Sequence, residues 1–125
     1  MKLHHFGLEV SNLEDSVDFY KNHLGFQEEK RFRFMEEEIV FLTHGDCRLE
    51  LIVSNTLNAH ICFEVSNLDK MMTRLTGLRK VEGPYKLDNG WQTVFYEGPT
   101  KVILEFLQTT NDHNLSSTKN MKSEN

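Results

Sequence analysis

The chain of 125 residues is long enough for one domain and too short for two, so any site must be built by one core or between copies of the chain. Its formal net charge of -5 argues against a nucleic-acid or anionic-membrane surface held by bulk electrostatics. It contains neither a long apolar run nor the apolar core of a signal peptide, which predicts a cytoplasmic protein without a membrane span. Cys47 and Cys62 are interpreted as reduced core residues.

The end of the chain differs in composition from the rest. Residues 109–125 contain only two large apolar side chains, Leu115 and Met121, which is too few to offset the entropy of ordering that segment. We therefore expect a disordered polar tail at 109–125 and one folded domain at 1–108.

The domain contains an internal repeat. Residues 9–13 (EVSNL) recur letter for letter as residues 64–68, a spacing of 55 positions. The same spacing relates two histidines and two glutamates, namely His5 to His60 and Glu50 to Glu105. The domain is therefore interpreted as two copies of one unit, covering residues 3–54 and 58–108.

The hydrophobic pattern of the first repeat predicts a strand, a helix and three further strands. Asn12 is a suitable residue for the start of the helix, and Gly25 for its end. The expected ranges are a strand at 3–10, a helix at 13–24, and strands at 26–34, 38–43 and 47–53.

The second repeat predicts the same order of elements. Gly77 is expected to close its helix. The expected ranges are a strand at 59–65, a helix at 68–75, and strands at 80–86, 91–96 and 101–107. Together the two repeats predict an α+β fold of two tandem βαβββ units.

Strand alternation places four polar side chains on the faces that point away from the helices. Two imidazoles and two carboxylates form a ligand set suited to Zn, Ni, Co, Mn or Fe, with positions left for water or substrate oxygens. The four residues are His5, Glu50, His60 and Glu105. The alternative interpretation is that they are solvated residues on the outer faces of antiparallel sheets.

Two neighbouring residues are further candidate ligands. His4 adjoins His5 but has the opposite strand phase, and we interpret it as a buried histidine at a sheet edge. Cys62 shares the face of His60 and could be a soft ligand or a reactive thiol, but a small inert core residue is the commoner case. Nucleotide-loop, serine-hydrolase and HExxH patterns are absent from the sequence.

Three segments carry a family resemblance: residues 3–10 (LHHFGLEV), residues 16–26 with their FY and LGF elements, and residues 59–65 (AHICFEV). Over residues 3–108 the chain resembles the vicinal oxygen chelate superfamily, which has the glyoxalase and bleomycin-resistance fold. The resemblance implies a curved mixed sheet around a metal-binding cleft, a small-molecule substrate, and a homodimer.

The order His, Glu, His, Glu is similar to that of glyoxalase I. The resemblance implies that His5, Glu50, His60 and Glu105 bind a divalent metal ion, one of Ni, Zn, Co or Mn. It also implies a lyase or isomerase that converts the thiol hemithioacetal of a 2-oxoaldehyde into a 2-hydroxyacyl thioester. Glu105 would be the catalytic base, with Glu50 as a ligand or as the second acid/base.

Two departures from glyoxalase I concern the substrate. Glu9 and Ser54 stand where the family holds the carboxylate of glutathione with an arginine and an asparagine. Because an acid repels a carboxylate, we expect a thiol other than glutathione. Residues 83–86 (GPYK) resemble the loop that closes over substrate, where Lys86 could contact an anion or could simply be an exposed lysine.

Two other functions stay open. One is a different metal-dependent reaction on the same scaffold, such as epimerisation or thiol transfer to an antibiotic. The other is a protein that binds a small ligand of the bleomycin type without turnover.

Overall fold

The computed structural model describes residues 1–56 and 58–109 of the chain. They divide into two compact units, which we call the N-terminal unit (His5–His60) and the C-terminal unit (Met1–His4 with the residues from Ile61 onward). The tail predicted at 109–125 lies outside the described residues, apart from Thr109.

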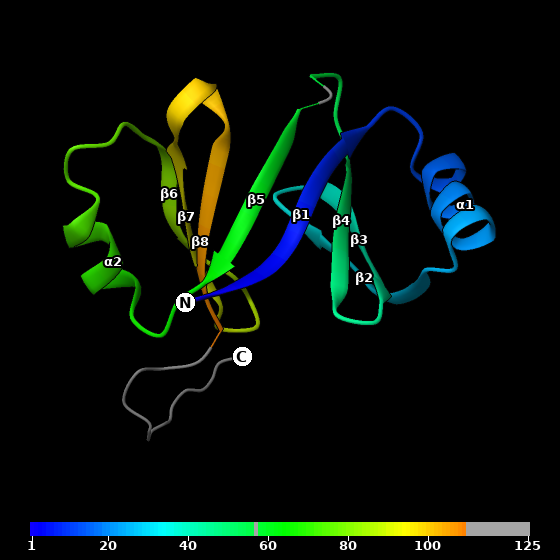
Figure 1. Ribbon diagram of the computed structural model, residues 1–125, viewed down its shortest axis with the longest axis horizontal. Coiled ribbons are helices and arrows are strands. Elements are labelled where there is room, and N and C mark those ends of the chain that lie inside the picture. Colours follow the sequence, from blue (N-terminus) through cyan, green and yellow to red (C-terminus); the bar gives the residue numbers. More distant parts are fainter. Residues whose placement is uncertain (57, 110–125) are drawn as a thin grey trace. The chain divides into compact units, whose positions relative to one another are not determined.

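The N-terminal unit holds four neighbouring strands and one helix (Figure 1). In strand order β2-β3-β4-β1, β1 and β4 pair in parallel, whereas the β3–β4 and β2–β3 pairs are antiparallel. Because both kinds of pairing occur, the strands of this unit are mixed, as predicted. The elements are β1 (Lys2–Val10), α1 (Leu13–Leu24), β2 (Gln27–Phe34), β3 (Glu37–His44) and β4 (Cys47–Val53).

Both ends of α1 follow from local sequence. The side chain of Asn12 accepts a hydrogen bond from the backbone N–H of Asp15 (3.0 Å), which satisfies one of the free donors of the first turn. Gly25 ends the helix in the left-handed conformation (φ 78°), which a residue without a Cβ adopts at no steric penalty. The helix then buries Leu13 and Val17 against alternate residues of β3 and β4.

The C-terminal unit repeats this organisation. Its strands follow in the order β5-β8-β7-β6, and Asn67 starts its helix by accepting a hydrogen bond from the Lys70 N–H (2.9 Å). Its core contains Leu68, Met71 and Phe106. The elements are β5 (Ala59–Glu64), α2 (Leu68–Arg74), β6 (Lys80–Lys86), β7 (Gln92–Glu97) and β8 (Ile103–Gln108). The predicted α+β class with two βαβββ repeats is confirmed.

The prediction that Gly77 closes the second helix is wrong. Helix α2 ends at Arg74, and the N–H of Leu75 donates to the carbonyl oxygens of Met71 and Met72 (3.2 and 3.1 Å). Gly77 does not adopt a positive φ, so it does not provide a left-handed cap. The end of α2 is therefore set two residues earlier, by backbone hydrogen bonds that every residue type except proline can donate.

The last strand also starts later than predicted. A short 3-10 turn, Pro99–Lys101, precedes β8, which begins at Ile103 instead of residue 101. Thr100 and Lys101 have positive φ (59° and 65°), which strand residues do not adopt, so the pairing begins only after them.

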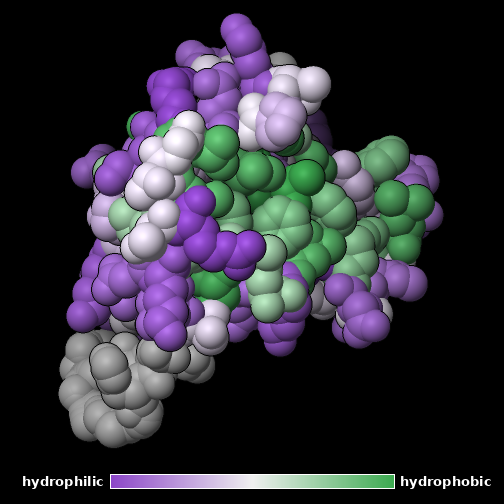
Figure 2. Space-filling view, turned by 60° about the vertical axis from the view of Figure 1, so that its left-hand side comes forward, coloured by the Kyte–Doolittle hydropathy of each residue, from purple (hydrophilic) through white to green (hydrophobic). Residues whose placement is uncertain are grey.

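Hydrophobic side chains also reach the surface, where Figure 2 shows them as green areas beside purple hydrophilic residues. Examples are Phe6 (40% exposed) on β1 and Phe19 (51%) on α1.

Cys62 is buried as predicted, whereas Cys47 is exposed at the start of β4, which corrects its interpretation as a core residue. Within the described residues, none of the helices is both long and apolar enough to cross a membrane.

Candidate metal site

Three of the four predicted ligands meet inside the N-terminal unit. His5 and Glu50 lie on the paired strands β1 and β4, where the register aligns Gly7 with Glu50. The next residue on each strand, Leu8 and Leu51, belongs to the hydrophobic core under α1. Alternation therefore turns His5 and Glu50 away from the helix, as predicted. His60 joins them from the start of β5, whose first two residues belong to this unit.

The three donor atoms form a nearly equilateral triangle. Nε2 of His5 lies 3.3 Å from Nε2 of His60 and 3.5 Å from Oε1 of Glu50. The third side, from Nε2 of His60 to the same Oε1 of Glu50, is 3.2 Å. One atom of each side chain is thus directed at one common point.

This triangle fits a transition-metal ion. A point about 2 Å from all three atoms lies close to their plane, and about 2.0–2.2 Å is the usual distance from zinc to imidazole nitrogen or carboxylate oxygen. The donor set of nitrogen and oxygen suits Zn, Ni, Co or Mn, and three protein ligands leave room for others. His5, Glu50 and His60 thus have the geometry and chemistry of metal ligands.

Burial makes a cation at this point more favourable. His5 is 2% and Glu50 7% exposed, and the ring of Phe41 lies against His5 with 5.2 Å between centroids. A buried carboxylate needs a compensating positive charge or hydrogen bonds, and electrostatic attraction is stronger away from water. Phe41 is one residue of this environment that the sequence reasoning did not identify.

Glu105 is placed in the C-terminal unit, on β8. It is 7% exposed and accepts a hydrogen bond from the hydroxyl of Thr93 on β7, with 2.5 Å between Oγ1 and Oε2. Thr93 is itself buried (3% exposed). The hydroxyl holds the carboxylate in one orientation, and Thr93 is a second residue that the sequence reasoning missed, because only the pairing of β7 with β8 brings the two together.

Glu9 is fixed by the connection between β4 and β5. Its Oε1 accepts hydrogen bonds from the hydroxyl of Thr56 and from the backbone N–H of Asn58 (3.1 Å). Partial burial acts to raise the pKa of Glu9, but the hydrogen bonds from Thr56, Asn58 and Ser54 together outweigh it, so its pKa lies below the ordinary value. Glu9 is therefore an anion held in place at neutral pH.

The structure also places the other residues that the sequence predicted near the substrate, namely residues 83–86 and Ser54. Residues 83–86 are not a loop: they belong to β6, which pairs with β7 through two register irregularities. Lys86 is the last residue of that strand and is exposed. The hydroxyl of Ser54 lies 3.0 Å from the hydroxyl of Thr56, within the hydrogen-bonded group around Glu9.

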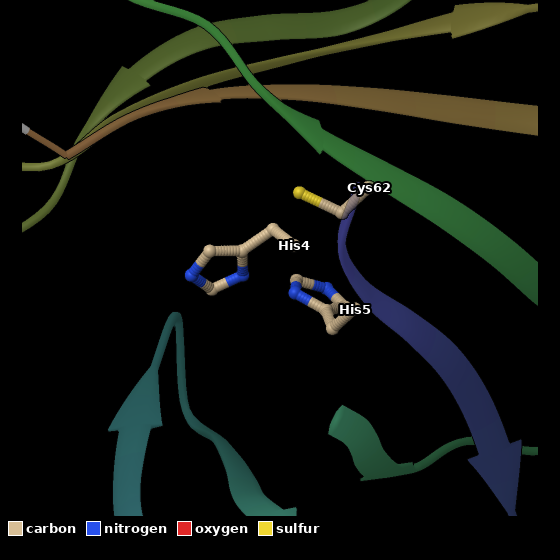
Figure 3. A group of neighbouring side chains, drawn as sticks. All are labelled: His4, His5 and Cys62. Carbon is tan, nitrogen blue, oxygen red and sulfur yellow. The ribbon is translucent and has the colours of Figure 1, made fainter. Parts of the chain in front are cut away.

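His4 is buried (9% exposed), as predicted, and its surroundings explain why. Its ring meets the ring of Trp91 edge-on, with 5.6 Å between centroids. A ring nitrogen of His4 also lies within 4.8 Å of the sulfur of Cys62 (Figure 3). Strict alternation predicts that these two side chains lie on different faces, whereas the structure brings them close together.

Comparison with known proteins agrees with this fold. Residues 2–106 match the family model of the glyoxalase/bleomycin resistance protein/dioxygenase superfamily. The chain belongs to this superfamily, which confirms the resemblance noted in its sequence. No curated protein sequence matches the chain.

Solved structures with a similar fold include a hypothetical protein BH1468 from Bacillus halodurans C-125, with 21% identity, a TM-score of 0.70, and coverage of 99% of this chain and 98% of that one. Methylmalonyl-CoA epimerase from Mycobacterium tuberculosis has 19% identity and a TM-score of 0.72, with 87% and 88% covered. A variant of the Streptomyces coelicolor epimerase in complex with 2-nitronate-propionyl-CoA has 20% identity and a TM-score of 0.71, with 87% and 94% covered. At these identities the likeness concerns the fold alone.

Proposed function

We propose that this chain is a metal-dependent enzyme that isomerises the thiol hemithioacetal of a 2-oxoaldehyde to a 2-hydroxyacyl thioester, as the likeness of its ligand order to that of glyoxalase I implies. The observation that carries the proposal is the triangle of donor atoms from His5, Glu50 and His60. Two imidazoles and a carboxylate at these separations, buried in one unit, are better explained by a shared cation than as solvated surface residues.

Glu105 is proposed as the fourth ligand on the basis of the repeat. It stands 55 residues after Glu50, as His60 stands 55 residues after His5. The four residues then supply two nitrogen and two oxygen donors, one pair from each repeat.

The proposed reaction is a proton transfer between neighbouring carbons. A divalent cation held by these residues would supply Lewis-acid polarisation of the two vicinal oxygens of the substrate. The carboxylate of Glu105 removes the proton from the carbon that bears the thiol and returns it to the adjacent carbon. The hydroxyl proton on the first carbon passes to the oxygen of the adjacent carbon, so the first becomes the thioester carbonyl, the second becomes the hydroxyl-bearing carbon, and no proton is gained or lost overall. Thr93 orients that carboxylate through its hydroxyl.

Glu9 supports a thiol other than glutathione. Its carboxylate is anionic and is fixed by the residues between β4 and β5. A second carboxylate brought to this place would meet like charge, whereas a neutral or cationic group would not. Lys86 is proposed to contact an anionic part of the substrate elsewhere.

Epimerisation of an acyl thioester is the second candidate. The solved structures that share the fold include methylmalonyl-CoA epimerases. The same carboxylates could return the proton to the carbon from which it came, on the opposite face, instead of to its neighbour. Incubation of an acyl thioester in deuterium oxide separates the two reactions: an epimerase exchanges the hydrogen next to the carbonyl for deuterium and returns the same compound, whereas the isomerase acts on a hemithioacetal and forms a 2-hydroxyacyl thioester.

Metal content tests the proposal first. Protein purified without chelator or affinity metal is analysed by mass spectrometry beside His5→Ala, His60→Ala and, as a control, His23→Ala on the exposed face of α1. We expect near-stoichiometric metal in the wild type and the control, and its loss in the other two variants. Failure to bind Ni, Co, Mn or Zn on reconstitution would contradict the proposal.

Turnover is then measured with hemithioacetals of methylglyoxal and several thiols. We expect product with a thiol that carries no carboxylate near its sulfur, and less with glutathione. A homodimer is proposed from the family resemblance, and light scattering on the purified protein tests it.

A further inference from the structure

Gly7 lies on the same face of β1 as His5, in register with Glu50. The imidazole of His60 lies directly over it. A Cβ at position 7 would be 1.9 Å from Cε1, 2.3 Å from Nε2 and 2.4 Å from Nδ1 of His60. The ring therefore occupies the volume that any side chain at position 7 would fill.

Space is the reason for glycine at this position. Gly7 does not have a positive φ, unlike Gly25, Gly45, Gly83 and Gly90, so alanine could adopt its backbone conformation. The three nearest atoms to a Cβ all belong to the His60 ring, and none belongs to the backbone. A methyl group would therefore meet the His60 ring first and would force that ring off β1.

The second repeat lacks this space. The position that corresponds to Gly7, 55 residues later, is Cys62, whose buried side chain lies beside His4 (Figure 3). Only the first strand of the first repeat thus leaves room for an imidazole over its backbone. The two histidines occupy matching positions in the repeat, yet glycine stands at position 7 and cysteine at position 62.

We infer that Gly7 is a positioning residue for the metal ligand His60. Its missing side chain lets the His60 ring lie on β1, where Nε2 comes within 3.3 Å of His5 Nε2 and 3.2 Å of Glu50 Oε1. The role of His60 as a metal ligand rests on the proposed function, but the steric relation between Gly7 and His60 does not depend on it.

The test uses Gly7→Ala, with Gly77→Ala as the matched control. Gly77 has no positive φ, and a Cβ there meets nothing within 4 Å, so the control adds the same methyl group to open space. We expect Gly7→Ala to weaken Ni or Zn binding by roughly 10- to 100-fold, the size of effect that residues orienting metal ligands have. The side-chain NMR signals of His60 should move in the metal-free protein, and the control should match the wild type in both measurements.

A double variant shows whether Gly7 acts through His60. If it does, Gly7→Ala lowers the melting temperature of the wild type but has little effect in a His60→Ala background, where the added methyl group has space. Should Gly7→Ala alone fail to fold, recovery of folding in the double variant supports the inference.

Equal destabilisation in both backgrounds, failure of both to fold, or unchanged His60 signals in Gly7→Ala would overturn it. The double-variant cycle and the NMR signals need no metal. A wild type that binds no metal therefore contradicts the proposed function and leaves the relation of Gly7 to His60 to be decided by these two results.

Discussion

The two repeats carry matching glutamates in different surroundings. Glu50 meets the imidazoles of His5 and His60, whereas Glu105 accepts a hydrogen bond from the hydroxyl of Thr93. A carboxylate beside two imidazoles is suited to hold a cation, and one oriented by a hydroxyl is suited to exchange a proton with a substrate. The difference teaches that equivalent positions of a repeat can take separate chemical roles, and it supports the assignment of the base to Glu105.

The first strands of the two repeats also carry matching glutamates in different surroundings. Glu9 and Glu64 correspond in the repeat, but Glu9 is held by residues of the connection between the repeats. Glu64 instead lies 3.9 Å from the ammonium of Lys2 and accepts a hydrogen bond from Thr109 (2.6 Å). Glu9 lies on β1, the strand that carries His5, where a fixed negative charge can select substrates, whereas the contacts of Glu64 are with residues near the two ends of the described chain.

The two glutamate-to-glutamine variants should give the largest and clearest difference. We expect Glu105→Gln to lower kcat by roughly 10²- to 10⁴-fold even at saturating metal, because it removes the base as well as weakening one ligand, without opening a core cavity. Glu50→Gln should instead weaken metal binding before it affects the rate at saturating metal. Measurements of kcat and metal affinity on both variants test this difference. Identical behaviour of the two variants would contradict separate roles for Glu50 and Glu105.

Thr93→Val tests whether the hydroxyl is what distinguishes Glu105. The change keeps the shape of the side chain but leaves a buried carboxylate with one donor fewer, which costs about 1–3 kcal/mol of stability and disorders the base. Activity should fall while Thr93→Ser retains it. Denaturant unfolding and steady-state kinetics measure the two effects, and wild-type kinetics in Thr93→Val would show that the hydrogen bond is dispensable.

Glu9→Gln tests the selection of the thiol. The amide keeps a hydrogen-bond acceptor for Thr56 and Asn58 but removes the negative charge. We expect KM for a carboxylate-bearing thiol adduct to fall by roughly two- to fivefold, the range of partly exposed charge pairs, with little change for a neutral one. An equal change for both adducts contradicts a charge effect.

The smallest effect concerns one ion pair in each unit. A hydrogen bond from Arg31 lowers the pKa of Glu14, and one from Arg79 lowers the pKa of Glu97. Because the folded pKa lies below the ordinary value, each pair stabilises the fold above about pH 4.5 and loses this contribution as the pH falls through the lowered pKa.

Melting temperatures of the wild type, Glu14→Gln and Glu97→Gln measured from neutral to acid pH check this. Each variant should melt slightly below the wild type at pH 7, and the difference should vanish in acid. Arg31 binds Glu14 with two nitrogens, at 2.6 and 3.0 Å, so the larger difference is expected for that pair. A difference that persists in acid would show that the side chains matter through packing instead.

Helix ends show where sequence reasoning works and where it stops. Gly25 and Gly77 looked alike in sequence, but only Gly25 has the left-handed conformation of a helix cap. A cap is decided by the next few residues and by where the chain must go afterwards. The start of α1 at Asn12 could be predicted because the hydrogen bond from an N-cap side chain reaches only three residues ahead, and Asn67 makes the same bond at the start of α2.

The residues around the candidate ligands show the same limit. Spacing and strand alternation predicted that His5 and Glu50 share a face, and the repeat added His60. Thr93 and Gly7 could not be predicted in this way. Thr93 reaches Glu105 only through the register of β7 with β8, and Gly7 matters because the ring of His60, 53 positions later in the chain, lies over it.

The sequence by itself determined the α+β fold, the two repeats, and the kinds of side chain available for chemistry, because these follow from local periodicity and from similarity between the two halves. Only the tertiary structure decided that three donor atoms converge within 3.5 Å, that Thr93 holds Glu105, and that His60 lies on the bare backbone at Gly7. Such contacts join residues far apart in the chain, and their distances depend on strand register and packing, which no short stretch of sequence contains.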